Sequence, residues 1–326
     1  MTTDKTKLRT TDTMRAAVIR RFGGPEALKV ELIPIPQPKL GEVLVRIRAA
    51  SINPLDYKIR SGQLQLLTGK NFPRILGCDF AGEVVDTNST ETEFGVGTRV
   101  FGMLNGFKGG GYAEYASVPV EWLAHTPTVL TDQEAAAIPV AARTAWKALR
   151  NLLHKVQPQS VLINGASGGV GTFAVQLARI IGVHVTAVSS RDAFNLVEQL
   201  GAERLLDYKE TDFIKSSDRY NLIFDVAGNR NFCKCAPILN PKGLYITTAP
   251  SFQGVLAFVF AQPFTGKKAL ILDLRPDGTD LTNIARMVTE NNLRPIVGKI
   301  FPLSEVAAAH TYGETKHPRG KIILQI

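Results

Sequence analysis

The sequence predicts an α/β protein with two kinds of sheet: an antiparallel barrel or sandwich, followed by a doubly wound parallel sheet. Before about residue 130, short strands with alternating polarity are separated by Gly, Pro and Asn. Closely spaced strands with such turns are typical of barrels and sandwiches. After that point the strands become continuous apolar runs and alternate with helical segments. This pattern is typical of a parallel sheet covered by helices on both faces.

Length and composition set limits on the class of protein. The 326 residues suggest about two domains, and 44% hydrophobic with 21% charged residues is ordinary for a globular protein. The formal charge of +9 is spread along the chain. It therefore favours a solvated basic surface over a nucleic-acid site, and it would steer a small anionic ligand. No apolar run approaches the ~20 residues that span a bilayer.

The N-terminal segment and the cysteines indicate the cellular compartment. Residues 1–13 are polar and hydroxyl-rich, so we expect a disordered leader and not a signal peptide. The three cysteines, Cys78, Cys233 and Cys235, are too few for a disulfide framework. An odd, sparse count without a secretory segment favours a reducing cytoplasm.

The antiparallel part is predicted from alternation. Within 41–50, Val43, Val45 and Ile47 alternate with Leu and Arg, which predicts a half-buried strand. Further strands are expected in RAAVIRRFGGPE, IPIPQPKLG, GEVVDTNST, GTRVFGMLNG and GYAEYASVP. Thr131 and Glu134 form a capping-box pattern at the start of an Ala-rich helical stretch, where the texture changes.

The parallel part is predicted from buried strands at 161–164, 184–189, 222–228, 244–249 and 269–274. Two helices separate the earlier strands. The first has an apolar face that includes Val170, Phe173 and Leu177 and ends at Gly182; the second ends at Gly201. The tail after 296 returns to a strand–helix–strand mix.

The turn between the first two elements of this sheet reads Gly165-Ala166-Ser167-Gly168-Gly169-Val170-Gly171. Its frame is Ala166-x-Gly168-x-x-Gly171, with alanine where the dinucleotide fingerprint has its first glycine. Gly168 would let the backbone approach a pyrophosphate, and Gly171 would let the helix pack on its strand. A strand–turn–helix setting favours a nucleotide site over a tight structural turn, because free N–H groups at a helix N-terminus bind anions.

The end of the second strand, VSSRD, indicates which nucleotide binds. An NAD site usually has an acidic residue there, whereas this chain has Ser189, Ser190 and Arg191. Two hydroxyls and a guanidinium suit a 2′-phosphate, so we expect NADPH as the cofactor. Asp192 follows and is expected to begin the next helix.

Several motifs together resemble the medium-chain dehydrogenase/reductase superfamily, in its zinc-free quinone oxidoreductase-like branch. They are SINPLDYKIRSG, FPRILGCDFAGEV, GGYAEYASVP, IPVAARTAWKAL, INGASGGVG, GAERLLDYKE and RGKIILQI. The resemblance implies a GroES-like barrel domain formed by residues 14–135 and 276–326. It also implies an inserted Rossmann NADPH-binding domain over 136–275.

The resemblance also bears on metal. Zinc-dependent alcohol dehydrogenases of the superfamily bind a catalytic zinc with Cys, His and Cys, and the matching positions here are Asn53, Cys78 and Val140. One ligand of three is too few for such a site, so we expect no metal. A metal-free site suits acceptors that are already electrophilic, such as quinones and α,β-unsaturated carbonyls.

The candidate catalytic residues lie in SINPLDYKIRSG. Asn53 matches the family's active-site Asn and would orient the acceptor or the nicotinamide ribose. Tyr57 would polarise the carbonyl or pass a proton, although Tyr112 or Tyr115 would serve equally. Asp56 is expected to fix the loop; alternatively, Asn-Pro simply begins a turn capped by Asp56.

Further cofactor contacts follow from the resemblance, with an ordinary strand or helix end as the alternative for each. They are Thr144 near the nicotinamide or phosphates, Tyr208 near the 2′-phosphate, and Ala227, Gly228 and Thr248 beside the nicotinamide.

The expected function is therefore reduction of a quinone by NADPH. The alternatives are reduction of the C=C bond of an alkenal or enone, and an NADPH-binding structural or RNA-binding protein. The expected partner is a small electrophilic acceptor, with no nucleic acid, in a cytoplasmic homodimer. The Phe-rich stretch 251–264 is expected to be a pocket wall, a dimer contact or plain core.

Overall fold

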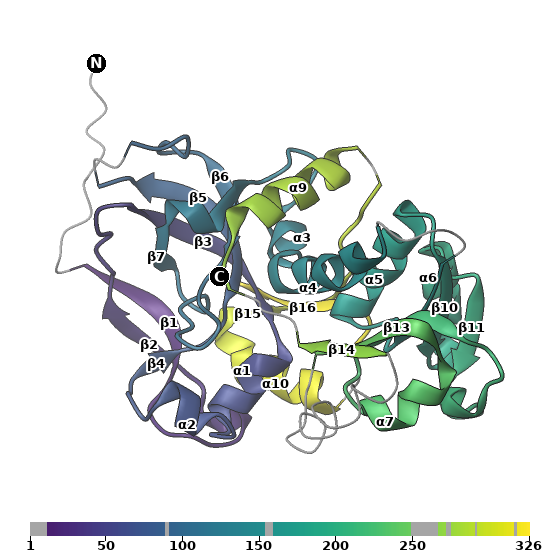
Figure 1. Ribbon diagram of the computed structural model, residues 1–326. Helices are drawn as coiled ribbons and strands as arrows, with labels where there is room; N and C mark the ends of the chain where they lie inside the picture. Colours follow the sequence, from purple (N-terminus) through teal and green to yellow (C-terminus); the bar gives the residue numbers. More distant parts are fainter. Residues whose placement is uncertain are drawn as a thin grey trace. The chain divides into compact units, whose positions relative to one another are not determined.

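The computed structural model describes residues 12–88, 91–153, 159–248, 267–271, 275–290, 292–315 and 318–326. Contacts divide them into two units (Figure 1). One comprises the described residues of Met1–Val140, Arg275–Glu290 and Ile296–Ile326, and the other comprises those of Ala141–Leu274 and Asn291–Pro295. The first division falls after Val140, near the start of helix α4 (Pro139–Leu149).

The first unit is built mainly from antiparallel strands. Its strands are β1 (Thr13–Ile19), β2 (Lys29–Pro34), β3 (Glu42–Ile52), β4 (Arg74–Ile75), β5 (Asp79–Asp86), β6 (Arg99–Met103), β7 (Tyr115–Pro119), β8 (Leu123–His125), β15 (Val297–Pro302) and β16 (Lys321–Gln325). Its helices are α1 (Pro54–Arg60), α2 (Gln65–Thr68), α3 (Asp132–Ala136), α9 (Gly278–Thr289) and α10 (Val306–Thr315).

One sheet of this unit has the order β15-β16-β3-β5-β6-β8, with β7 also paired to β3, and the other has the order β2-β1-β4. The C-terminal strand β16 pairs with β3 from the N-terminal part, with Ile322 opposite Ile52 (Figure 1). The change of texture in the tail thus reflects a strand that returns to the first sheet.

The strand predictions hold with local differences. Val43, Val45 and Ile47 are buried as expected. Leu44 is also buried, at 1% exposure, because its side chain packs in a hydrophobic cluster on the other face of the strand, with Met14 and other residues of β1. The segment 35–40 is not a strand, which fits its two prolines, Pro36 and Pro38. The predicted leader, residues 1–13, includes one residue of a strand, because β1 begins at Thr13 and Thr13 pairs with Pro34.

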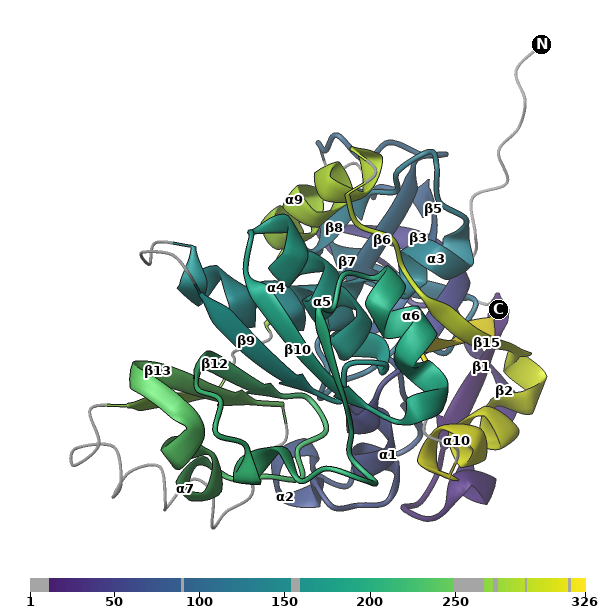
Figure 2. The same ribbon diagram turned by 90° about the vertical axis from the view of Figure 1, so that its right-hand side faces the viewer.

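The second unit contains a parallel sheet with the order β11-β10-β9-β12-β13-β14. Figure 2 shows its central strands β10, β9, β12 and β13 side by side. Its strands are β9 (Ser160–Asn164), β10 (His184–Ser189), β11 (Arg204–Asp207), β12 (Tyr220–Asp225), β13 (Leu239–Thr247) and β14 (Lys268–Ile271). Its helices are α4, α5 (Gly169–Ile180), α6 (Phe194–Gln199) and α7 (Phe232–Cys235).

The strand order reverses between β9 and β12. In parallel sheets of this kind, ligands bind beyond the carboxyl ends of the strands at such a reversal. The turn that follows β9, with its glycines, lies at this point. The topology therefore directs attention to the residues that follow β9, β10, β11, β12 and β13.

In the second unit the helix predictions are confirmed, and one strand was missed. Phe173 and Leu177 of α5 are fully buried, and Gly182 ends the helix with a φ of +72°. The short strand β11 was not predicted because its four residues, RLLD, show no apolar run. The Phe-rich stretch 251–264 lies outside the described residues.

Candidate active site

The turn after β9 needs glycine at two positions. Gly165 has a φ of +88°, and its N–H and that of Ala166 donate to the carbonyl of Val188, each at 3.0 Å. A Cβ at Gly171 would lie 2.1 Å from the carbonyl oxygen of Gly165. The tight-turn glycine is thus Gly165, one residue before the position where the fingerprint has it, which explains why alanine fits at 166.

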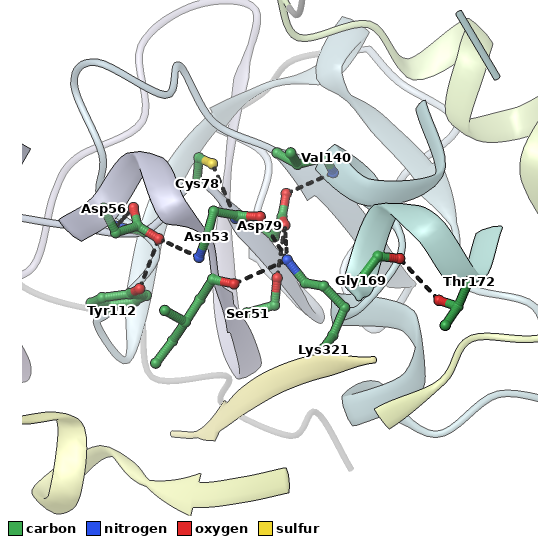
Figure 3. A network of polar contacts seen from close by, with 12 residues as sticks. Ser51, Asn53, Asp56, Cys78, Asp79, Tyr112, Val140, Gly169, Thr172 and Lys321 are labelled. Atoms are coloured by element: carbon green, nitrogen blue, oxygen red, sulfur yellow. Dashed lines mark hydrogen bonds and ion pairs between the residues drawn. The ribbon is translucent and has the colours of Figure 1, made fainter. Parts of the chain in front are cut away.

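The N-terminus of α5 has no side-chain cap. Its N-cap is Gly168, which has no side chain to bond the first N–H groups. A Cβ at Gly168 would have its nearest neighbour at 3.6 Å, an ordinary contact, so no neighbouring group would clash with it. Within the first turn, Thr172 Oγ1 donates to the carbonyl of Gly169 (Figure 3). The first N–H groups of a helix have no intrahelical acceptor, so this end fits a diphosphate group.

The ends of β10 and β11 bring the predicted 2′-phosphate residues together. Ser189 and Asp207 are paired in the sheet, and Tyr208 N–H donates to the carbonyl of Ser189 at 3.3 Å. Ser190 and Arg191 follow Ser189 directly, and Arg191 is exposed, whereas Ser189 is buried. Asp207, which the sequence analysis did not single out, is buried and accepts hydrogen bonds from the backbone N–H groups of Arg191 and Lys209.

The loop after β12 is fixed by Asp225. This fully buried carboxylate accepts from Asn164 Nδ2 at 2.7 Å, from Tyr245 Oη at 2.9 Å and from the N–H of Gly228 at 3.0 Å. Ala227 N–H donates to the carbonyl of Asn164 at 3.1 Å. The backbone at Ala227 and Gly228 is therefore held at the carboxyl end of β9, beside the glycine turn.

Two predicted cofactor residues lie in other elements of this unit. Thr248 follows β13, and its Oγ1 donates to the carbonyl of Val226 at 3.0 Å. Thr144 is buried in α4. The strand ends thus bring together most of the predicted cofactor residues, and Thr144 comes from a helix.

A second polar cluster lies in the first unit, around Asn53, Asp79 and Lys321 (Figure 3). Asn53 precedes α1, Asp79 begins β5 and Lys321 begins β16. Lys321 Nζ lies 2.6 Å from Asn53 Oδ1, 3.1 Å from the carbonyl of Ile52 and 3.4 Å from Asp79 Oδ2. An ammonium group has three N–H donors, and each faces an acceptor here.

Asp79 is the centre of this cluster. Its Oδ2 accepts from Ser51 Oγ at 2.7 Å and from Asn53 Nδ2 at 2.9 Å, and its Oδ1 accepts from the N–H of Val140 at 2.9 Å. Asn53 Nδ2 also lies 3.7 Å from Cys78 Sγ. Both polar atoms of the Asn53 amide therefore already bind other residues of the protein.

These residues do not fit a zinc ion. Asn53, Cys78 and Val140 do lie near one another (Figure 3), but the Asn53 amide points its NH₂ group at the thiol, and Val140 has no donor atom in its side chain. Burial raises the pKa of the Cys78 thiol, and the nearby Asp79 and Asp56 raise it further, which opposes the thiolate that zinc requires. Among the described residues, no group of three or more His, Cys, Asp and Glu side chains could hold a metal.

Asp56 fixes the start of α1, as expected. Its Oδ2 accepts from the N–H of Asn53 at 2.8 Å and from Tyr112 Oη at 2.9 Å, and its Oδ1 accepts from the N–H of Gly77 at 3.2 Å. Burial raises the pKa of Asp56 to about 6, although the bonds from Asn53 and Tyr112 lower it. The loop that carries Asn53 is thus held by Asp56 from one side and by Asp79 from the other.

Tyr57 faces another part of the unit. Its ring lies 5.0 Å from that of His310 in an edge-to-face arrangement, and a Cβ at Gly313 would lie 1.8 Å from its hydroxyl. Burial raises the pKa of Tyr57. Its phenol thus packs against α10, and the structure does not bring it together with the Asn53 amide.

His310 joins this region to Asp56. Arg60 donates to His310 Nδ1 at 3.0 Å, and a guanidinium can only donate. His310 Nε2 therefore carries the proton and donates to Tyr112 Oη at 3.3 Å. Burial, together with the charge of Arg60, lowers the pKa of His310 to about 3.

Comparison with known proteins identifies the family. Residues 39–128 match the family described as Alcohol dehydrogenase GroES-like domain, and residues 200–324 match Zinc-binding dehydrogenase. The chain is 34% identical to the quinone-oxidoreductase homolog, chloroplastic, of Spinacia oleracea over 93% of this chain and 95% of the relative. It is 30% identical to the NADPH-dependent alkenal/one oxidoreductase, chloroplastic, of Arabidopsis thaliana over 95% and 79%.

A solved structure is also similar. The quinone oxidoreductase from Coxiella burnetii matches with a TM-score of 0.90 and 31% identity, over 97% of this chain and 100% of that chain. Together with the GroES-like match and the parallel sheet, this confirms the predicted fold, and the relatives identify the chain as an oxidoreductase. No helix within the described residues has the length and apolar character needed to cross a bilayer. The chain belongs to the medium-chain dehydrogenase/reductase superfamily, among its quinone oxidoreductase-like members.

Proposed function

We propose that this chain is an NADPH-dependent oxidoreductase that transfers hydride to a quinone without a metal ion. The observation that carries the proposal is the N-terminus of α5, which has no side-chain cap and lies at the point where the strand order reverses, in a chain whose relatives are quinone oxidoreductases. The proposed diphosphate donors are the backbone N–H groups of Ser167, Gly169 and Val170. Those of Gly165, Ala166 and Gly168 already donate within the turn or to Val188, so these three residues would shape the turn around the diphosphate.

The choice of NADPH rests on the end of β10. Ser189, Ser190 and Arg191 offer hydroxyls and a guanidinium there, and Tyr208 lies beside Ser189. One relative is named as NADPH-dependent, which supports the same cofactor. Bound NADPH would supply the hydride.

The acceptor would have to be electrophilic without help from a metal. The cluster of Asn53, Asp79 and Lys321 supports this, because its atoms satisfy one another and do not form a zinc donor set. Asn53 and Asp56 would shape the loop beside the acceptor. A role for Tyr57 in proton transfer stays a prediction, and it would require the phenol to leave its contact with α10.

The second candidate is reduction of the C=C bond of an α,β-unsaturated carbonyl. The relative named alkenal/one oxidoreductase favours it. The same site would serve, because both acceptors delocalise charge onto a carbonyl oxygen that hydrogen-bond donors stabilise. The non-enzymatic alternative is not retained, because the relatives are oxidoreductases. A cytoplasmic location and a homodimer remain proposals from the sequence.

A direct test follows NADPH oxidation by absorbance with a panel of quinones beside a panel of alkenals and enones. Turnover of quinones alone supports the first candidate, and turnover of the alkenes alone supports the second. No turnover on either panel contradicts both. Incubation with a chelator should leave the rate unchanged, and loss of activity that added zinc restores would contradict the metal-free mechanism.

A further inference from the structure

The guanidinium of Arg191 is already bound to a carboxylate. Arg191 Nη2 donates to Glu210 Oε2, and the two side chains lie at the carboxyl ends of neighbouring strands β10 and β11. We propose that Glu210 sets the preference of this chain between NADPH and NADH by competing with the 2′-phosphate for Arg191. This inference rests on the proposed function, since it assumes that a nicotinamide dinucleotide binds at this sheet edge.

The position of Glu210 is set by the backbone and not only by its flexible side chain. Asp207 Oδ1 accepts from the N–H of Lys209 at 2.9 Å, and Asp207 Oδ2 accepts from the N–H of Arg191 at 3.2 Å. The N–H of Glu210 donates to the carbonyl of Asp207 at 3.1 Å. One buried carboxylate thus ties the turn that carries Glu210 to the segment that carries Arg191.

The surrounding charges give Glu210 a specific role. Asp207 lies 3.9 Å from Arg191 Nε, but its side chain is only 6% exposed and both of its oxygens accept backbone N–H groups. Glu210, with a side chain 58% exposed, can move away from Arg191 when a ligand arrives. Asp192 and Lys209 are also exposed at this edge. Of Asp207 and Glu210, the two carboxylates that lie near the Arg191 guanidinium, Glu210 is the one that can exchange.

Arg191 can exchange Glu210 for the 2′-phosphate of NADPH, whereas NADH has no phosphate there to take the place of Glu210. An ion pair between exposed side chains is weak, whereas a guanidinium binds a phosphate through short, paired, charge-assisted hydrogen bonds. NADPH would therefore displace Glu210 from Arg191, at the cost of that pair and of a carboxylate left near a dianion. NADH has a ribose hydroxyl at this position, so the Arg191–Glu210 pair would stay intact when it binds. Glu210 thus weakens NADPH binding selectively.

The test measures dissociation constants of NADPH and NADH by calorimetry for the full chain, so it needs no turnover. In Glu210→Gln, NADPH should bind roughly three- to tenfold tighter, and NADH should change less than about twofold. Glu203→Gln is the matched control. It removes the same charge from an exposed residue of this unit that pairs with His184 at the start of β10, and it should leave the NADPH/NADH ratio unchanged.

A double-mutant cycle separates the mechanism from a general charge effect. Arg191→Ala should weaken NADPH by at least about tenfold, and in that background Glu210→Gln should have less than half of its effect on NADPH. An equal effect of Glu210→Gln with and without Arg191, or an equal effect of Glu203→Gln, would overturn the proposal. If the wild-type chain binds neither nucleotide, the proposed function itself is wrong. If it binds both but Glu210→Gln changes nothing, only this inference fails.

Discussion

Replacing His310 with glutamine should remove one source of acid sensitivity from the first unit. His310 is fully buried, accepts from Arg60 and donates to Tyr112, so it is held neutral in the folded state. An unfolded chain exposes this imidazole and protonates it near its ordinary value. Acid therefore favours the unfolded state at this residue.

The size of the effect follows from the two pKa values. With an ordinary value of 6.5 and a folded value of about 3, lowering the pH from 7 to 5 costs the wild-type chain about 2 kcal/mol at His310. Below both values the cost would reach roughly 5 kcal/mol. His310→Gln does not have this cost. On going from pH 7 to pH 5, its unfolding free energy should therefore rise by about 2 kcal/mol relative to that of wild type.

Asp56 acts in the opposite direction. Its pKa is raised from 3.8 to about 6 by burial, so the folded state takes up a proton before the unfolded state as the pH falls. The contribution of Asp56 to stability is therefore present at low pH and is lost as the pH rises through about 6. Between pH 7 and pH 5 it amounts to about 1 kcal/mol. Asp56→Asn should accordingly lose about that amount relative to wild type on acidification.

The assay is urea unfolding at pH 7 and pH 5, followed by Trp fluorescence. The chain has two tryptophans, and Trp122 lies in the first unit with His310, whereas Trp146 lies in the second. A Trp146→Phe background thus reports the unit of interest. His184→Gln is the control, because that imidazole is 63% exposed and lies in the second unit.

One result would refute the reasoning. Suppose that the difference in unfolding free energy between His310→Gln and wild type is the same at pH 7 and pH 5 within about 0.5 kcal/mol. His310 is then not held neutral by burial and Arg60. If the unfolding free energy of His310→Gln falls relative to that of wild type on acidification, the effect has the opposite sign to the one predicted.

Two further predictions concern the glycine turn and the buried ion pair. Gly171→Ala should lower the unfolding free energy of the second unit by more than about 2 kcal/mol, because its Cβ would lie 2.1 Å from the carbonyl of Gly165. Gly168→Ala should cost about 1 kcal/mol or less yet weaken NADPH binding, as denaturation and calorimetry will show; equal destabilisation by both would contradict the geometry. Lys321→Met should cost about 3–5 kcal/mol by leaving the Asp79 carboxylate buried without its cation. Adding Asp79→Asn should recover part of this in Trp122-monitored unfolding, and no recovery would mean that lost packing dominates.

Local patterns predicted most of the second unit. The strand at 184–189 has the bounds of β10, and the end of α5 at Gly182 was also correct. On the predicted apolar face of α5, Phe173 and Leu177 are fully buried, whereas Val170 is only half-buried. These features depend on neighbours in sequence, such as burial on both strand faces and a glycine with positive φ after a helix. The sequence did not predict that the glycine of the tight turn is Gly165, one residue before the first glycine position of the fingerprint. It depends on how the turn meets β10, where the N–H groups of both Gly165 and Ala166 donate to Val188.

The cluster in the first unit could not be predicted in this way. Lys321 and Asn53 are 268 positions apart and meet because β16 pairs with β3. The signal that was available is a charged residue at the head of an apolar strand, as with Lys321 before IILQ and Asp79 before FAG. Charged residues are almost never fully buried unless they are paired, so two such strands could have been expected to bring opposite charges together.

The register of β16 decides whether this cluster can form. Side chains alternate between the two faces of a strand, so a slip of one residue would move Lys321 to the opposite face and leave Asp79 buried without its cation. The same register pairs Ile322 with Ile52, the residue just before Asn53, and Ile52 supplies a carbonyl to Lys321. The C-terminal strand therefore does more than extend the sheet. Its pairing brings the cation to the loop that carries Asn53, so the geometry of that loop depends on the last residues of the chain.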